Sequence, residues 1–211
     1  MRPIVILGLG GHAKSINDLV EGIGYRETYY CDFLDKNDFS VPDNKVKSYL
    51  QVVEDFKNYD FVLGIGEEIL RRKLLESIIQ SMPNANFPSL IHENAYVSKT
   101  AKIGKGTVVF SGAYLGPNAV LGDWSVLNTN SVVEHDSRIG NSCIISIGVT
   151  VAGNVVIEDE CFLGMGALVS HSITVGRRAR IFAGSFVNKN VGSGESVLGI
   201  PGRIKIGRAH V

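Results

Sequence analysis

The residue best suited to chemistry in this sequence is His135, which lies between two acids, Glu134 and Asp136. A histidine titrates near neutral pH and can accept a proton from an attacking nucleophile. A neighbouring carboxylate can orient the imidazole and stabilise its cationic form, and either acid could do this here. The segment predicts a general base, and the alternative is an ordinary surface histidine.

The elements that position His135 form a repeat of six residues. This period fits neither an amphipathic helix nor a plain strand alternation, and it indicates a hexapeptide-repeat parallel β-helix. A series of ordinary β-hairpins would show irregular strand spacing instead. An aliphatic residue occupies every sixth position without a break: Ile91, Val97, Ile103, Val109, Leu115, Leu121, Leu127, Val133, Ile139, Ile145, Val151, Ile157, Leu163, Val169, Val175, Ile181 and Val187.

The fifth residue of each hexad is small or β-branched at almost every repeat, so we expect it to point inward. Cys143 and Cys161 hold this position eighteen residues apart. We expect them to stack as small apolar fillers and to form neither a metal site nor a disulfide. Glycine often follows the aliphatic residue, which suits corners where the backbone turns tightly: Gly104, Gly116, Gly122, Gly140, Gly164 and Gly176.

Three hexads make one coil, so residues eighteen apart should stack at the strand spacing of about 4.8 Å. Gly153 then lies beside His135, leaves space for the ring, and offers a backbone N–H that could stabilise an oxyanion. His171 lies in the same column and is the rival base. His92 in the first rung and His210 in the tail are weaker candidates.

A second group of candidate residues lies near the N-terminus. Residues 8–13 read Gly-Leu-Gly-Gly-His-Ala, which fits a turn between a strand and a helix, and Asp32 lies near the end of the next strand. Such a turn lets a phosphate approach the backbone, and an acid can bind a ribose hydroxyl. Gly66 lies in a second glycine turn, from which Arg71 could reach a phosphate. A tight turn without a ligand and a solvated Arg71 are the alternatives.

Residues 1–88 are predicted to form a small Rossmann-like α/β module. Strands are expected at residues 3–9, 28–33 and 61–65 and helices at 12–23 and 67–82, the alternation of parallel βαβ units. Only one mononucleotide-binding half fits before the repeats, which favours a mononucleotide over NAD. Pro83 and Pro88 mark the junction to residues 89–211. These residues are predicted to form an all-β parallel β-helix with a C-terminal tail.

The composition excludes several partner classes. The 211-residue chain carries 21 basic and 21 acidic side chains, so nothing favours nucleic acid or an anionic membrane surface. No apolar run approaches the roughly 18 residues that cross a bilayer. Glycines cut short the apolar run at the N-terminus, so it does not fit a signal peptide. We expect a cytoplasmic protein.

Several short motifs are spread over both parts of the chain. They are the glycine-rich turn at residues 8–12, Gly-Glu-Glu at 66–68, Leu-Ile-His at 90–92, Asn-Thr at 128–129, Val-Glu-His-Asp at 133–136, Ala-Gly-Asn at 152–154 and Phe-Leu-Gly at 162–164. Together they resemble the bacterial sugar O-acyltransferase family of left-handed β-helix enzymes. That family includes sialic acid O-acetyltransferases and the nucleotide-linked amino-sugar N-acetyltransferases of the bacillosamine and perosamine types.

The resemblance implies acetyl transfer from acetyl-CoA to the amino group of a nucleotide-linked deoxy amino sugar. His135 would be the catalytic base, with Asp136 where close relatives carry Glu. The residues implied to bind the nucleotide sugar are Gly10, Gly11, His12, Asp32, Gly66 and Arg71. Acetyl-CoA would lie near Gly153, Met165 and Ala183, whose spacing also places them on two adjacent columns.

The resemblance further implies a homotrimer with each active site between subunits. No residue arrangement in the sequence demands a metal. Ile144 departs from the pattern, because some relatives carry a second histidine there in the CoA pocket. The tail at residues 199–203 resembles the family's C-terminal motif, with Gly202 in place of alanine. Several basic residues could contact CoA phosphates: Arg177, Arg178, Arg180, Lys189 and Arg203.

Three other functions stay open from the residues alone. The nearest is O-acetylation of sialic acid or a related sugar. An NAD-linked dehydrogenase would use the glycine turn, but the repeats offer no hydride-transfer partner. A non-catalytic scaffold would use the β-helix only as a surface, and His135 beside Gly153 argues against it.

Overall fold

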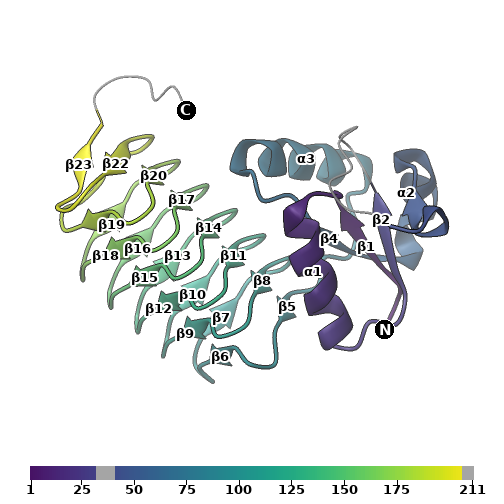
Figure 1. Ribbon diagram of the computed structural model, residues 1–211, viewed down its shortest axis with the longest axis horizontal. Coiled ribbons are helices and arrows are strands. Elements are labelled where there is room, and N and C mark those ends of the chain that lie inside the picture. The colour runs from purple at the N-terminus through teal and green to yellow at the C-terminus, as the bar shows by residue number, and fades with distance from the viewer. Residues whose placement is uncertain (32–40, 206–211) are drawn as a thin grey trace. The chain divides into compact units, whose positions relative to one another are not determined.

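The computed structural model describes residues 1–31 and 41–205 of the chain. The chain divides into two units, Met1–Leu90 and Ile91–Val211, and each is described by itself (Figure 1). Within the described ranges, no helix combines the length and the apolar character that crossing a membrane would require.

The first unit contains a four-stranded sheet in the order β3-β2-β1-β4, and all three pairings are parallel. Its strands are β1 (Ile4–Leu7), β2 (Thr28–Cys31), β3 (Val46–Lys47) and β4 (Asp60–Leu63). Every residue of β1 and β4 is buried, as expected for inner parallel strands. The predicted parallel arrangement is confirmed, while the predicted end of the second strand at Phe33 lies outside the described residues.

Helices α1 (Gly11–Gly22) and α3 (Glu68–Ser81) begin and end within one residue of the predicted positions. The sequence analysis missed β3, a short helix α2 (Tyr49–Asp55), and the 3-10 turns η1 (Asp43–Lys45) and η2 (Phe56–Asn58). A capping box between Ser48 and Gln51 starts α2. That spacing is visible in the sequence and could have revealed the helix.

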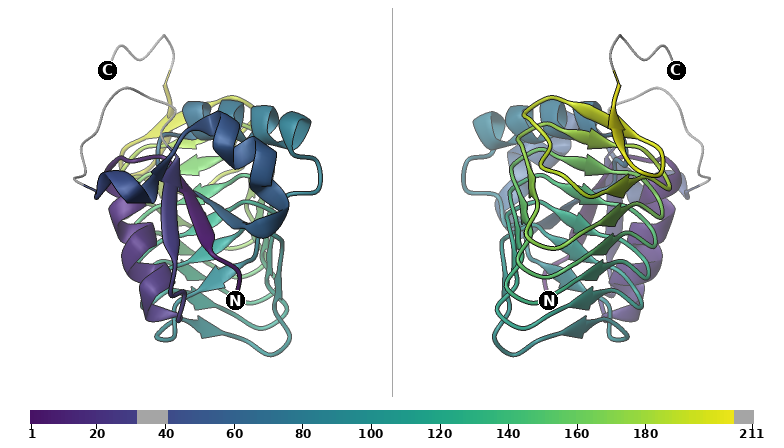
Figure 2. Two further views of the ribbon diagram at one scale, coloured as in Figure 1. Left: turned by 90° about the vertical axis from the view of Figure 1, so that its right-hand side faces the viewer. Right: turned by 90° about the vertical axis from the view of Figure 1, so that its left-hand side faces the viewer.

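The second unit is a β-helix whose three sheets run along its axis (Figure 2). Most of its strands have two residues. One sheet contains β7 (Lys102–Ile103), β10 (Val120–Leu121), β13 (Arg138–Ile139), β16 (Val156–Ile157) and β19 (Thr174–Val175). A second contains β6 (Tyr96–Val97), β9 (Tyr114–Leu115), β12 (Val132–Val133), β15 (Thr150–Val151), β18 (Leu168–Val169) and β21 (Phe186–Val187).

The third sheet contains β5 (Leu90–Ile91), β8 (Val108–Val109), β11 (Val126–Leu127), β14 (Ile144–Ile145), β17 (Phe162–Leu163), β20 (Arg180–Ile181), β22 (Ser196–Leu198) and β23 (Arg203–Ile204). Parallel partners are eighteen residues apart, as in Val132↔Thr150 and Val120↔Arg138. The predicted coil of three hexads is therefore confirmed. The register shortens only at the end, where Arg180 pairs with Ser196 and β23 runs antiparallel to β22.

The structure gives a different reason for glycine at the corners from the one predicted. A Cβ on Gly122 would lie 2.5 Å from the Gly140 carbonyl oxygen of the next coil, and one on Gly116 would lie 2.9 Å from the His135 nitrogen. These glycines permit close approach between coils. The tight turn itself falls two residues later, at left-handed residues such as Asn118 (φ 59°) and Asp136 (φ 60°), residue types that tolerate this conformation.

The small inward residues satisfy buried backbone groups. Ser125 Oγ donates to the Gly140 carbonyl oxygen at 2.8 Å and accepts from Cys143 N–H at 2.9 Å. Cys143 Sγ donates to the Glu158 carbonyl oxygen at 3.1 Å, and Cys161 repeats the contact one coil on. Both cysteines are buried and free of disulfides, as predicted, but they act as hydrogen-bond donors and not only as apolar fillers.

We predict that Ser125→Ala lowers the free energy of unfolding of the β-helix by about 1–3 kcal/mol, because it leaves a buried N–H and a buried carbonyl without their partner. Ser125→Cys is the matched control, because cysteine fills the next two places of the same column and donates there. Ser125→Cys should lose clearly less free energy of unfolding than Ser125→Ala. Urea unfolding of the three proteins measures both values, and equal losses would contradict the hydrogen-bonding role.

Candidate active site

The proposed base lies on the corner between β12 and β13. His135 Nδ1 lies 2.9 Å from Asp136 Oδ2, and about half of each side chain is exposed. Glu134 instead accepts from the His135 backbone N–H at 3.3 Å. Of the two acids that the sequence left open, Asp136 is therefore the one that meets the imidazole.

The imidazole covers Gly153 of the next coil. A Cβ on Gly153 would lie 2.6 Å from both His135 Cε1 and Nε2. Asn154 N–H donates to the His135 carbonyl oxygen at 3.0 Å, which stacks the two corners in register. The Gly153 N–H donates no hydrogen bond within residues 1–31 and 41–205. The sequence argument that pairs these residues by eighteens is thus matched by a direct contact.

The charge of Asp136 indicates which ring nitrogen of His135 carries the proton. Hydrogen bonds from His135, and next from Asn118, lower the pKa of Asp136, so its carboxylate is ionised and can only accept. His135 Nδ1 must then carry the proton that it donates to Asp136. Nε2 keeps its lone pair, beside Gly153, and is free to take a proton.

The other histidines lack this arrangement. His92 Nδ1 accepts from the Asn94 N–H at 3.0 Å. His171 is exposed and has no carboxylate partner in the described part of the chain. His210 lies outside the described residues. No group of three or more His, Cys, Asp or Glu side chains among the described residues could hold a metal ion.

Met165 and Ala183 lie on the corner at the opposite edge of the sheet that contains β15 and β18. Gly166 N–H donates to the Ile147 carbonyl oxygen and Gly184 N–H to that of Met165, both at 2.9 Å, so this column stacks as the first does. Met165 is 60% exposed and Ile147 47%. These two exposed apolar side chains offer a surface on which a long, partly apolar ligand could pack. Ile144 is buried on the neighbouring sheet.

Three of the five basic residues considered for phosphate binding contact other side chains of the β-helix. Arg178 Nε donates to Glu160 Oε2 at 2.7 Å, and Arg177 pairs with the other oxygen. Burial alone would raise the pKa of Glu160, but these hydrogen bonds outweigh it and lower the pKa to about 2. Arg180 stacks over the Phe162 ring at 5.5 Å, whereas Lys189 and Arg203 are exposed beside a cavity of about 300 Å³.

In the first unit, the two glycine turns lie together at the ends of β1 and β4. A Cβ on Gly8 would meet Ile65 and Gly64, and one on Gly66 would lie 3.3 Å from His12 Cβ. Gly10 and Gly11, which begin α1, face open space. Helix α1 has no side-chain cap at Gly10, so its first N–H groups suit an anion.

Arg71 differs from its predicted role. The side chain is 3% exposed, and Nη1 donates to the carbonyl oxygens of Leu63 at 2.8 Å and Ile65 at 3.3 Å. The guanidinium thus holds the second glycine turn from inside, and no exposed phosphate ligand is seen at this position. Burial lowers its pKa to about 10, so it stays cationic at neutral pH. Asp32, the predicted ribose ligand, lies outside the described residues.

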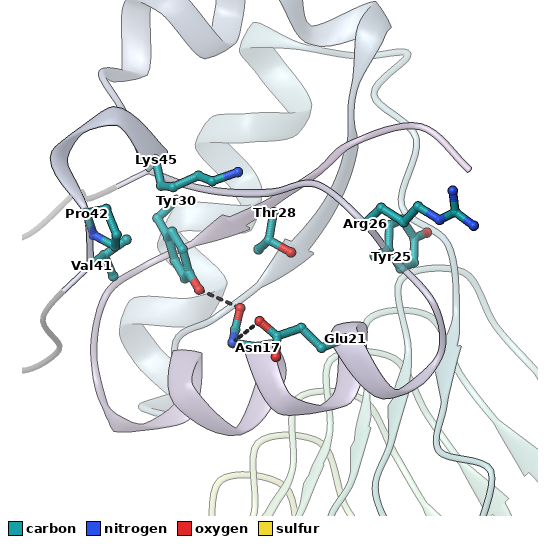
Figure 3. Close-up of a pocket in the computed structure, with 9 residues that line it drawn as sticks. All are labelled: Asn17, Glu21, Tyr25, Arg26, Thr28, Tyr30, Val41, Pro42 and Lys45. Carbon is teal, nitrogen blue, oxygen red and sulfur yellow. Dashed lines mark hydrogen bonds between the residues drawn. The ribbon is translucent and has the colours of Figure 1, made fainter.

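A separate pocket of about 390 Å³ lies between α1, β2 and residues 41–45 (Figure 3). The Tyr30 hydroxyl donates to Asn17 Oδ1, and Asn17 Nδ2 donates to Glu21 Oε1 at 2.9 Å. Among the described residues, none of those predicted to bind the sugar lines it. The pocket is therefore distinct from the glycine turns.

We predict that Gly153→Ala destabilises the protein only while the imidazole is present. The added methyl displaces the exposed His135 ring and breaks its hydrogen bond to Asp136, at a cost of about 0.2–1 kcal/mol. In a His135→Ala background the same change should be nearly neutral, since Ala183 shows that this hexad position accepts a Cβ. Thermal unfolding of both single variants and the double variant measures the coupling, and additive effects would refute the contact.

His12 predicts a pH dependence of stability. Burial and then the charge of Arg71 lower its pKa from 6.5 to about 3. The unfolded chain thus binds a proton that the folded chain excludes, so His12 destabilises the fold as pH falls below 6.5 and has no such effect above it. Between these pKa values the wild type should lose up to about 1.4 kcal/mol per pH unit more than His12→Gln. Urea unfolding at several pH values measures the free energy of unfolding of both proteins. If the two free energies changed equally with pH between 3 and 6.5, the folded protein would not exclude a proton from His12.

Comparison with known proteins gives matches in both units. Residues 3–78 match the PglD N-terminal domain, and residues 154–189 match the hexapeptide repeat of succinyl-transferase. The chain is 30% identical over 120 residues to UDP-N-acetylbacillosamine N-acetyltransferase of Bacillus subtilis. That alignment covers 53% of this chain and only 52%, about half, of the Bacillus protein.

Two solved structures match nearly the whole chain. The acetyltransferase domain of PglB from Neisseria gonorrhoeae is 30% identical, with a TM-score of 0.88 over 97% of this chain and 100% of that domain. PerB from Caulobacter crescentus, solved in complex with CoA and GDP-perosamine, is 28% identical, with a TM-score of 0.87 over 96% and 97% of the two chains. Together with the coil geometry, these matches show that the chain belongs to the left-handed β-helix family of sugar N-acetyltransferases.

Proposed function

We propose that this chain transfers the acetyl group of acetyl-CoA to the amino group of a nucleotide-linked deoxy amino sugar. The observation that carries the proposal is the His135 ring, held by Asp136 with Nε2 free over Gly153. The Neisseria domain has been solved with acetyl coenzyme A and the Caulobacter enzyme with GDP-perosamine. Structures of the Caulobacter enzyme with a single histidine replaced are consistent with an important histidine in that relative.

The reaction needs one base and one oxyanion donor. The sugar amine attacks the thioester carbonyl carbon, and His135 Nε2 takes the proton that the amine loses as the C–N bond forms. The Gly153 N–H, which is free to donate, stabilises the tetrahedral oxyanion. The C–S bond then breaks, and the imidazolium returns its proton to the CoA thiolate. Asp136 keeps the imidazole oriented and stabilises its cationic form throughout.

The N-terminal domain, residues 1–88, is proposed to be a Rossmann-like domain that selects the nucleotide sugar. The uncapped start of α1 at Gly10, Gly11 and His12 would meet the diphosphate with backbone N–H groups. Gly66 would border this site, and Arg71 would act from beneath by holding the turn. His12 would be neutral, so it would contribute hydrogen bonding and no charge. Asp32 remains the proposed ribose ligand.

The second domain, residues 89–211, is proposed to bind acetyl-CoA along its outside, near Gly153, Met165 and Ala183. The stacked apolar column of Ile147 and Met165 supports this placement. We also propose a cytoplasmic homotrimer with active sites between subunits. No metal takes part in the proposed reaction.

The alternative is O-acetylation of sialic acid or a related sugar, because the same base could activate a hydroxyl. The Bacillus, Neisseria and Caulobacter relatives favour the amine. The choice is testable directly with substrates.

We predict that free CoA is released from acetyl-CoA in the presence of a UDP-, GDP- or TDP-linked amino sugar. Sialic acid and CMP-sialic acid should give no release above background. Thiol detection of CoA, with mass spectrometry of the sugar product, measures this. Release only with the sialic acids would replace the N-acetyltransferase proposal by the alternative.

We further predict that His135→Ala lowers kcat by about 10²–10⁴-fold, the usual contribution of a general base. His171→Ala is the matched control, one histidine in the same column without a carboxylate partner in the described chain. It should retain most turnover. A fully active His135→Ala protein would move the base to another residue.

A further inference from the structure

The His135–Asp136 pair continues into a third side chain one coil back. Asn118 Nδ2 donates to Asp136 Oδ1 at 3.1 Å, while Asp136 Oδ2 faces His135 Nδ1 at 2.9 Å. The two carboxylate oxygens thus have one partner each. Asn118 itself is anchored, because its backbone N–H donates to Thr100 Oγ1 at 2.9 Å. Thr100, Asn118 and Asp136 follow one another by eighteens in one corner column.

This arrangement matters because the pair lies in water. The side chains of His135 and Asp136 are 54% and 46% exposed, so screening weakens their attraction and water competes for both carboxylate oxygens. The Asp136 carboxylate can rotate about its last bond, which is only loosely restrained. A fixed donor on Oδ1 removes that freedom and holds Oδ2 toward the imidazole.

We propose that Asn118 is a positioning residue that acts through Asp136 to keep the proton of His135 on Nδ1 and leave Nε2 as the base. The side chain of Asn118 bonds to Asp136, and no hydrogen bond joins it to His135 within the described residues. The carboxamide is required because its NH₂ group donates, whereas a carboxylate in the same place would only accept. The lowered pKa of Asp136, to which the Asn118 hydrogen bond contributes, agrees with this role.

The same column supplies a matched control. Asn154 lies eighteen residues beyond Asp136, has the same left-handed backbone (φ 59°) as Asn118, and is likewise exposed. Its side chain makes no hydrogen bond to Asp136 or to other described residues. Glycine adopts this backbone without strain, and both substitutions keep the backbone N–H groups that bond to Thr100 and to His135. Asn118→Gly additionally removes a donor to Asp136.

The experiment records the tautomer of His135 by ¹H–¹⁵N correlation NMR at alkaline pH, where the imidazole is neutral, with its signals assigned by their loss in His135→Gln. Wild type and Asn154→Gly should show the Nδ1–H form, and Asn118→Gly a mixture with Nε2–H. Asn118→Asp, which keeps the shape but cannot donate, should behave like Asn118→Gly.

The catalytic consequence rests on the proposed function. With the amino-sugar substrate, Asn118→Gly should lower kcat about tenfold and leave the KM for acetyl-CoA unchanged, while Asn154→Gly stays near wild type. Wild-type tautomer and kcat in both Asn118 variants, or equal losses in both glycine variants, would overturn the inference. A tautomer change in a protein that acetylates no substrate would support the positioning role and refute only the proposed function.

Discussion

The constraint on which this β-helix depends is the in-register stacking of residues eighteen apart. Most strands have only two residues and cannot bury a side chain alone, so stability comes from the pairing of identical positions along the axis. The same register decides where functional groups meet. His135 lies over Gly153 because both are the third residue of a hexad in the same column. Core and site therefore have one geometric origin.

Hydrogen bonds to backbone carbonyl groups at the corners explain why fully buried positions of the repeat carry polar side chains. Thr107, Ser125 and Ser137 are fully buried, and each donates to a carbonyl oxygen fifteen residues ahead. A backbone that turns every six residues leaves corner carbonyls outside the strand ladder, and an unpaired buried carbonyl is costly. Short hydroxyl and thiol side chains meet this need without filling the narrow interior.

The sequence predicts best where the period encodes the answer. The six-residue period followed from the spacing, and the pairing of His135 with Gly153 followed once three hexads were taken as one coil, which the strand pairing confirms. The burial of Arg71 did not, because it depends on which rotamer the tertiary packing of the first unit favours. Helix α2 was not predicted, because a helix of seven residues is too short to show a clear helical period in its apolar residues. Asn118 was visible in principle, since it precedes Asp136 by one coil, but its contact depends on side-chain direction at a left-handed corner.

The last coil ends the parallel stacking of the three sheets. The shortened register places Val191 against Val175, and β23 folds back antiparallel on β22. Gly199 and Gly202 meet the Phe186 backbone at the end of a second sheet. The last strands of all three sheets thus find partners within their own chain. Exposed parallel edges can recruit strands from other molecules and grow into fibres. Residues 191–204 cap the last coil, and because β23 runs antiparallel to β22 it ends the parallel ladder instead of continuing it.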